Sequence, residues 1–171
     1  GSLDDVVIGP GTVTLSNSVT MVSLTVSNAG TLELTNWTTA AIAGAITVRS
    51  GGTIACAGPF PDGIMSNRVW LICTDLLVAA GGSINADARG YAGGIVVGTN
   101  GNGPGRGGIG GRGGAGGYGG RGGTSQYRTD ETVAGNPYGD AGAPVQPGSG
   151  GAAGDHAADG HGGGAVRVDA D

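Results

Sequence analysis

Two histidines and two aspartates near the C-terminus could bind a metal ion. Asp155, His156, Asp159 and His161 fall within one short stretch, and imidazole and carboxylate groups are ligands of transition metals. The stretch is rich in glycine and alanine, however, which gives little preorganisation to a metal cage. We therefore treat these four residues as weak candidates and predict neither a metal site nor a cofactor.

Three Arg-Gly-Gly units, at Arg106, Arg112 and Arg121, resemble RNA-binding boxes, in which an aromatic residue such as Tyr118 stacks on bases. The chain carries a net charge of −5, which argues against a nucleic-acid partner. The units also keep a regular spacing. We expect these arginines to form the exposed edge of an ordered segment and expect no nucleic acid to bind.

Exposed aromatic and arginine side chains are the best candidates for contact with a ligand, because such groups stack on sugars and anchor protein interfaces. The candidate ligand-binding residues are Trp37, Tyr91, Tyr118, Tyr127, Tyr138, Arg112 and Arg121. A structural alternative stays open, in which Tyr91 and Tyr138 hold the glycine-rich region in place.

Catalysis on a polysaccharide would require paired acids held close together. The acidic residues of the N-terminal half, among them Glu33, Asp62, Asp75 and Asp87, are scattered along the chain. We therefore predict that the protein is not an enzyme. A polysaccharide-active enzyme remains the alternative.

Glycine dominates the second half of the chain. It supplies 41 of 171 residues, and positions 106–123 form six consecutive X-Gly-Gly triplets. A period of three matches the three residues per turn of a polyproline II-type helix, and bare glycine edges let neighbouring chains approach closely. Residues 148–163 return to small residues at every third position. We predict packed polyglycine II helices over residues 90–164.

The first part of the chain repeats a strand, a glycine corner and a second strand. Residues 23–34, 45–56 and 75–86 align, and 11–15 matches the second half of an earlier copy. The alignment predicts inward columns Leu24/Ile46/Leu76, Val26/Val48/Val78, Leu32/Ile54/Ile84 and Leu34/Cys56/Ala86. Stacked repeats of this length are typical of a right-handed parallel β-helix, with a β-sandwich as the alternative.

A returning strand is predicted at the C-terminus, because 165–171 aligns with 69–75 and would pair Trp70 with Val166. The expected organisation is one solenoid domain over 3–171, with N-terminal coils at 3–89, an insertion at 90–164 and a truncated returning strand at 165–171. In this register Cys56 faces inward and Cys73 outward, which disfavours a disulfide. No segment has the length of a membrane span or the pattern of a targeting signal, and we expect no direct membrane insertion.

Several motifs resemble glycine-rich parallel β-helix modules of large bacterial extracellular and surface proteins. They are the stretches Gly82–Gly94, Gly103–Gly105, Gly117–Gly123, Pro147–Gly151 and Gly162–Val168. The predicted polyglycine packing also resembles that of phage tail-fibre tips. The resemblance implies an all-β solenoid found outside the cell or on its surface.

These observations predict a structural or adhesive extracellular module that contacts a cell-surface glycan or a protein receptor. A receptor-binding fibre tip is a further alternative, and it would imply a trimer.

Overall fold

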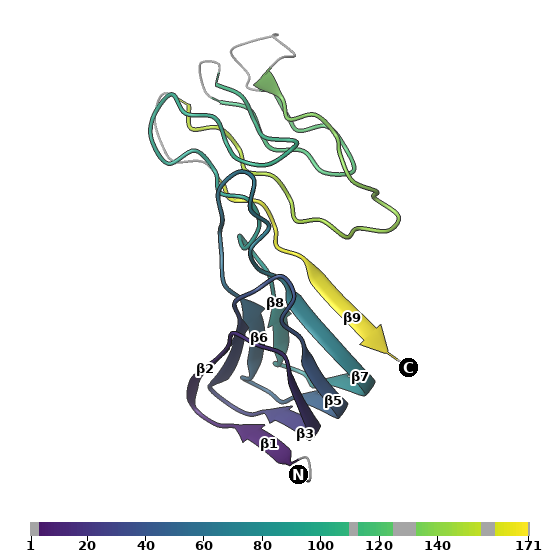
Figure 1. The fold of residues 1–171 in the computed structure, drawn as a ribbon. Coiled ribbons are helices and arrows are strands. Elements are labelled where there is room, and N and C mark those ends of the chain that lie inside the picture. Colours follow the sequence, from purple (N-terminus) through teal and green to yellow (C-terminus); the bar gives the residue numbers. More distant parts are fainter. Residues whose placement is uncertain (1–3, 110–112, 125–132, 155–159, 171) are drawn as a thin grey trace. The chain divides into compact units, whose positions relative to one another are not determined.

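The computed structural model describes residues 4–109, 113–124, 133–154 and 160–170, and its regular secondary structure is all-β. The described strands are β1 (Asp5–Ile8), β2 (Gly11–Leu15), β3 (Val19–Val26), β4 (Gly30–Leu34), β5 (Ala41–Val48), β6 (Thr53–Cys56), β7 (Val69–Val78), β8 (Ser83–Asn85) and β9 (Val166–Ala170). They form two parallel sheets, β1-β3-β5-β7-β9 and β2-β4-β6-β8 (Figure 1). The chain alternates between the sheets, an arrangement compatible with a β-solenoid. Among the described residues no helix is long and apolar enough to cross a membrane.

The described residues divide into two compact units. The solenoid unit comprises Gly1–Ala57, Asn67–Ala86 and Val166–Asp171, and contains all nine named strands. The glycine-rich unit comprises Gly58–Ser66 and Asp87–Ala165.

Strand pairing in the solenoid unit confirms the register of the predicted columns, whereas Val78, the last member of the column Val26/Val48/Val78, is 42% exposed. Leu24 pairs with Ile46 and Ile46 with Leu76. Leu32 pairs with Ile54, and Ile54 with Ile84. The side chains that alternate inward on these strands form one apolar core, with Val26, Leu34, Val48, Ile54 and Cys56 each fully buried. Because residues alternate across a strand, the intervening threonines and serines are left more exposed.

Glycine is required at each corner between strands for the same steric reason. A Cβ atom at Gly30, Gly52 or Gly82 would lie less than 3.0 Å from a carbonyl oxygen of the preceding coil. The residue before each of these glycines has a positive φ, which is 58° at Ala29, 75° at Gly51 and 81° at Gly81. The corner therefore needs a left-handed residue followed by one without a side chain.

The predicted register of the returning strand was wrong by one residue. Val69 pairs with Val166 and Trp70 with Arg167. Val69, Leu71 and Cys73 therefore face the core, with Leu71 fully buried. Cys73 is buried rather than outward, and burial followed by the charge of Asp75 raises the pKa of its thiol. Cys56 and Cys73 are both free thiols.

The core columns predict a steep difference between inward and outward substitutions. Ile54→Ala removes a side chain that is fully buried, and we expect it to lower the free energy of unfolding by about 2–5 kcal/mol. Val22→Ala is the control, because Val22 is 49% exposed on β3, and its effect should stay within about 0.5 kcal/mol. Urea unfolding followed by far-ultraviolet circular dichroism measures both. Equal losses would contradict the assigned inward columns.

The described glycine-rich unit is held together by backbone hydrogen bonds outside any named strand. Residues 148–153 bond to five other segments, which contain Tyr91 and Gly94, Thr99 and Asn102, Gly107, Gly114, and Gly160 and Gly163. A strand in a sheet has at most two hydrogen-bonded neighbours. The segments of this unit therefore pack in more than one plane.

Hydrogen bonds between these segments recur at every third residue. Tyr91 N donates to Gly148 O at 3.0 Å, and Gly94 N donates to Gly151 O at 2.9 Å. In an antiparallel pair, Gly117 N donates to Gly105 O at 2.7 Å and Gly114 N to Gly108 O at 3.0 Å. Steps of three on both partners match the period of three in the sequence.

Glycine is required at many of these positions by close backbone approach. A Cβ atom at Gly90, Gly101, Gly107, Gly114, Gly122, Gly150 or Gly162 would lie less than 3.0 Å from a backbone atom of another segment. None of these seven glycines has a positive φ in the described backbone. Space, rather than conformational freedom, therefore selects glycine here.

Two adjacent glycines provide a matched test of this packing. A Cβ atom at Gly162 would collide with Gly148 O, whereas one at Gly163 has nothing within 4 Å. We expect Gly162→Ala to lower the free energy of unfolding by about 1–3 kcal/mol, as overpacking does, and Gly163→Ala to be nearly neutral. Thermal unfolding of the two variants checks this. A neutral Gly162→Ala would rule out close backbone packing at this position.

Candidate functional site

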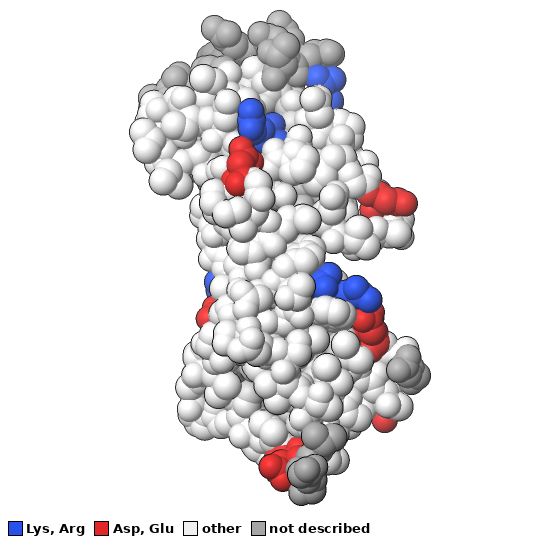
Figure 2. Space-filling view, in the orientation of Figure 1, with Lys and Arg blue, Asp and Glu red and all other residues white. Residues whose placement is uncertain are grey.

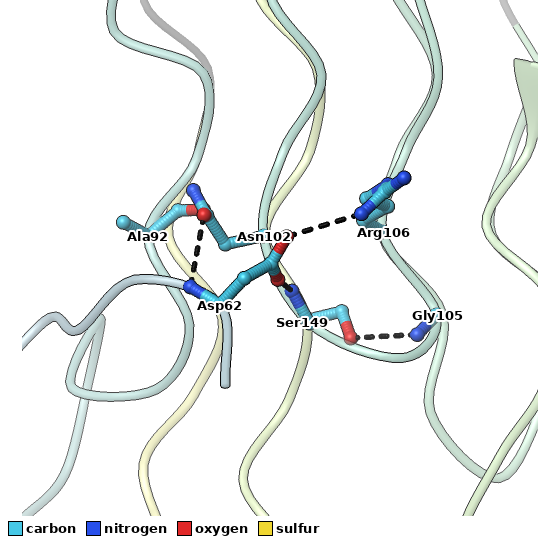
Figure 3. A network of polar contacts seen from close by, with 7 residues as sticks. Asp62, Ala92, Asn102, Gly105, Arg106 and Ser149 are labelled. Carbon is cyan, nitrogen blue, oxygen red and sulfur yellow. Dashed lines mark hydrogen bonds and ion pairs between the residues drawn. The ribbon is translucent and has the colours of Figure 1, made fainter. Parts of the chain in front are cut away.

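One carboxylate organises a polar network in the glycine-rich unit (Figure 3). Asp62 N donates to Asn102 Oδ1 at 3.1 Å, and the Asp62 side chain accepts a hydrogen bond from Gly103 N. Asp62 Oδ2 also pairs with Arg106 Nη1 at 3.0 Å. These contacts fix the segment that contains Asp62 against residues 102–106 and orient the Arg106 guanidinium.

The hydroxyl of Ser149 supports the same turn from the other side. Ser149 Oγ accepts a hydrogen bond from Gly105 N at 3.0 Å in a buried position. Asn102 Nδ2 donates to Ala92 O at 3.0 Å. The side chains of Asn102 and Ser149 thus join the segments that contain Ala92, residues 102–105 and Ser149. The glycines around them have no side chain that could do so.

A polar recess with a volume of about 580 Å³ opens beside this network. Its polar side chains are those of Asn100, Arg106 and Asn136, and Ile109 adds apolar surface. Asn100 Oδ1 accepts a hydrogen bond from Ile109 N at 2.8 Å, which fixes the amide at the rim. The Arg106 side chain is about half exposed and offers further N–H donors to a ligand.

A second depression, which we call the glycine groove, has a volume of about 370 Å³. Its walls come from residues 115–118, from 148, 149 and 151, and from 160–163, so that most of its lining is glycine backbone. Tyr118 and His161 contribute its two large side chains. His161 Nδ1 accepts a hydrogen bond from Gly93 N at 2.9 Å, which fixes the ring.

The predicted candidates Tyr118 and Tyr138 lie together. Their ring centroids are 5.0 Å apart in an edge-to-face arrangement, with an interplanar angle of 83°. Tyr138 OH donates to Pro147 O, and burial raises the pKa of the Tyr138 phenol. Tyr138 therefore anchors its loop, while Tyr118 also borders the glycine groove.

Tyr91 lies inside the glycine-rich unit. It is 6% exposed, and its ring packs edge-to-face against Phe60 with centroids 5.0 Å apart. A Cβ atom at Gly103 would collide with this ring. Tyr91 therefore packs the unit and presents little surface to a ligand.

Trp37 belongs to a stack of aromatic and guanidinium groups on the solenoid unit. Arg68 Cζ lies 4.9 Å from the ring centroid of Trp37 and 4.3 Å from that of Trp70. Arg167 Cζ lies 4.7 Å from the Trp70 ring, because these two residues are paired across β7 and β9. These cation–π contacts occupy ring surface that a sugar would otherwise stack on.

Polar contacts complete this stack. Asp169 accepts hydrogen bonds from Trp70 Nε1 and from Arg167 Nε, both at 2.9 Å. Burial, together with the charge of Arg167, lowers the pKa of Arg68. Arg68 Nε is buried without a hydrogen-bond partner in the described structure. Sequence reasoning missed the stack, although Arg68 directly precedes β7 and stands two residues before Trp70.

Of the remaining candidate site residues, only Arg121 belongs to the part of the chain that the structure describes. Arg121 is exposed in the glycine-rich unit. Arg112, Tyr127, Asp155, His156 and Asp159 lie outside the described residues. Among the residues that are described, no group of three or more His, Cys, Asp or Glu side chains is placed to hold a metal.

Charged side chains are sparse on the face drawn in Figure 2, where blue and red groups adjoin in small clusters with wide uncharged surface between the clusters. The described part of this face shows no broad basic surface of the kind that follows a phosphate backbone. A partner that bound to this face would therefore meet mainly uncharged groups.

Comparison with models of known protein families, with curated proteins and with solved structures finds no match to this chain.

The Asp169 contacts predict a dependence of stability on pH. Hydrogen bonds from Arg167 and then Trp70 lower the pKa of Asp169 below its ordinary value of 3.8. A depressed folded-state pKa stabilises the fold above the ordinary value, and that contribution is lost as the pH falls through the folded-state value. We therefore expect wild type to exceed Asp169→Asn in stability at about pH 5 and the difference to shrink towards about pH 2. Urea midpoints of both proteins test this, and a pH-independent difference would contradict it.

Proposed function

We propose that the solenoid unit is a right-handed parallel β-helix and that the glycine-rich unit is a bundle of polyglycine II helices. The handedness is favoured because β1 reaches its parallel partner β3 through β2 in the other sheet, and such crossovers are right-handed in nearly all proteins. Bonding at every third residue, to neighbours in several directions, supports the polyglycine assignment.

On this frame we propose a non-enzymatic structural and adhesive module of a large bacterial surface protein, working outside the cell. The module contacts a glycan or a partner protein through the glycine-rich unit. The observation that carries this proposal is the glycine groove, whose lining combines backbone groups of three segments with Tyr118 and His161.

The chemistry of the groove suits a carbohydrate. Backbone C=O groups keep a second lone pair with which to accept hydrogen bonds from sugar hydroxyls, and the Tyr118 ring offers an apolar surface to a sugar face. The groove walls carry few side chains with rotamers to order, which reduces the entropic cost of binding. A neutral glycan is therefore the preferred ligand of this groove.

The polysaccharide-active alternative would require a pair of acids free to act together. The Asp62 carboxylate is instead committed to Arg106 and to Gly103 N. A receptor-binding fibre tip is distinguished by its assembly, because light scattering would then give the mass of a trimer.

A glycan-array screen tests the proposal with a variant that obstructs the groove. Gly163 lines the groove, and a side chain built there meets no atom within 4 Å. Gly163→Leu should therefore fold normally and weaken glycan binding by about tenfold or more. Gly123→Leu is the matched control, because Gly123 is equally open but lies outside the groove.

The results of the screen test the position of the site and the class of ligand separately. Selective binding that survives Gly163→Leu would place the glycan site elsewhere. Absence of binding to any glycan by the folded wild-type protein would exclude the carbohydrate ligand and leave the structural role and a protein partner.

A further inference from the structure

Three consecutive aliphatic side chains are displayed to solvent by the glycine-rich unit. Ile95, Val96 and Val97 are 73%, 60% and 57% exposed. Ile109, which is 51% exposed, lies nearby, since its N–H donates to Asn100 Oδ1. Single exposed aliphatic residues are common, but a contiguous set requires an explanation. We call Ile95–Val97 the apolar tip.

The apolar tip is held in a fixed conformation. Gly94 N donates to Gly151 O at 2.9 Å on one side. On the other side Gly98 N donates to Ala153 O at 3.1 Å, and Ala153 N to Thr99 O at 2.9 Å. The Thr99 side chain closes the turn by donating to Val96 O at 2.6 Å. Ile and Val are also stiff at χ1, so that docking this surface would order little that is mobile.

The exposure of the tip has no evident role in folding. The unit contains few large apolar residues, and it buries Phe60, Tyr91 and Val133. Burying a Val or Ile side chain stabilises a folded protein, and three such contributions are forgone here. Contact with a partner would recover them.

The surroundings of the tip favour a protein over a lipid. Residues 90–105 contain no charged side chain, no Lys occurs anywhere in the chain, and the net charge is −5. Membrane-surface segments combine an apolar face with basic residues. Beside the tip, Asn100 and Arg106 line the polar recess. An apolar anchor next to polar groups is the anatomy of a protein interface.

We propose that the apolar tip is the anchor of a protein-binding surface, which docks into an uncharged apolar socket of a partner whose rim offers acceptors to Arg106 and Asn100. This contact extends the proposed adhesive role and uses different residues from the glycine groove. Either contact can therefore fail without the other.

The test uses the folded protein and a phage-displayed library of random dodecapeptides as the probe. Peptides enriched on wild type, with Val96→Asp protein as the competitor, should carry apolar residues. In fluorescence polarisation they should bind Val96→Asp at least about tenfold more weakly. Val145→Asp is the control, because Val145 is 70% exposed in the same unit and lies outside both the tip and the recess. It should bind like wild type.

Thermal unfolding establishes that the variants fold, and Val96→Ser replaces Val96→Asp if the charge loosens the turn. Failure to enrich peptides that depend on the tip would overturn the proposal. Val96-dependent partition of wild type into phosphatidylcholine vesicles would overturn it in favour of a lipid. Self-association of wild type that requires Val96, measured by sedimentation, would overturn the proposal in favour of a second copy of this chain as the partner.

Discussion

The need to satisfy backbone hydrogen bonds without side chains governs the glycine-rich half of this protein. Every buried N–H and C=O group requires a partner, and a unit built largely from glycine has little apolar area with which to offset the loss of chain entropy. Segments approach so closely that a Cβ atom at Gly107, Gly114 or Gly150 would collide with a backbone atom. Close approach allows each segment to bond with several neighbours. The missing side chains are thus what make this packing possible.

The solenoid unit follows ordinary strand rules, and most of its architecture could be predicted from the sequence. Its inward columns recur in a fixed order, so that aligning the repeats amounts to aligning the strands. The returning strand was misplaced because β7 is apolar at five consecutive positions, Val69 to Cys73, which hides the period of two. Trp70 is apolar on the outward face because Arg68 and Arg167 cover its ring. That cover depends on pairing between residues about a hundred positions apart, which a local pattern does not contain.

The glycine-rich unit shows a different limit of sequence reasoning. A period of three was visible in the triplets, but every third residue of one glycine segment can bond equally well to many others. The choice of partners is made by a few polar and aromatic side chains, such as Asp62 with Arg106 and Tyr91 with Phe60. Residue type alone does not distinguish an aromatic ring that packs the unit from one that borders a groove. Tyr91 and Tyr118 differ in this respect because of contacts with distant segments.

A frame stabilised mainly by backbone bonds separates folding from recognition. In most domains a surface loop is anchored by side chains that also pack the core, so that changing the loop changes stability. Here the apolar tip is fixed by bonds of Gly94, Gly98 and Thr99 to residues 151 and 153, and the side chains of Ile95–Val97 take no part in them. Exposed substitutions away from packing contacts change stability little. The tip and the rim of the recess can therefore change chemistry while the frame stays the same, which is the property that the proposed adhesive module would need in order to acquire new partners.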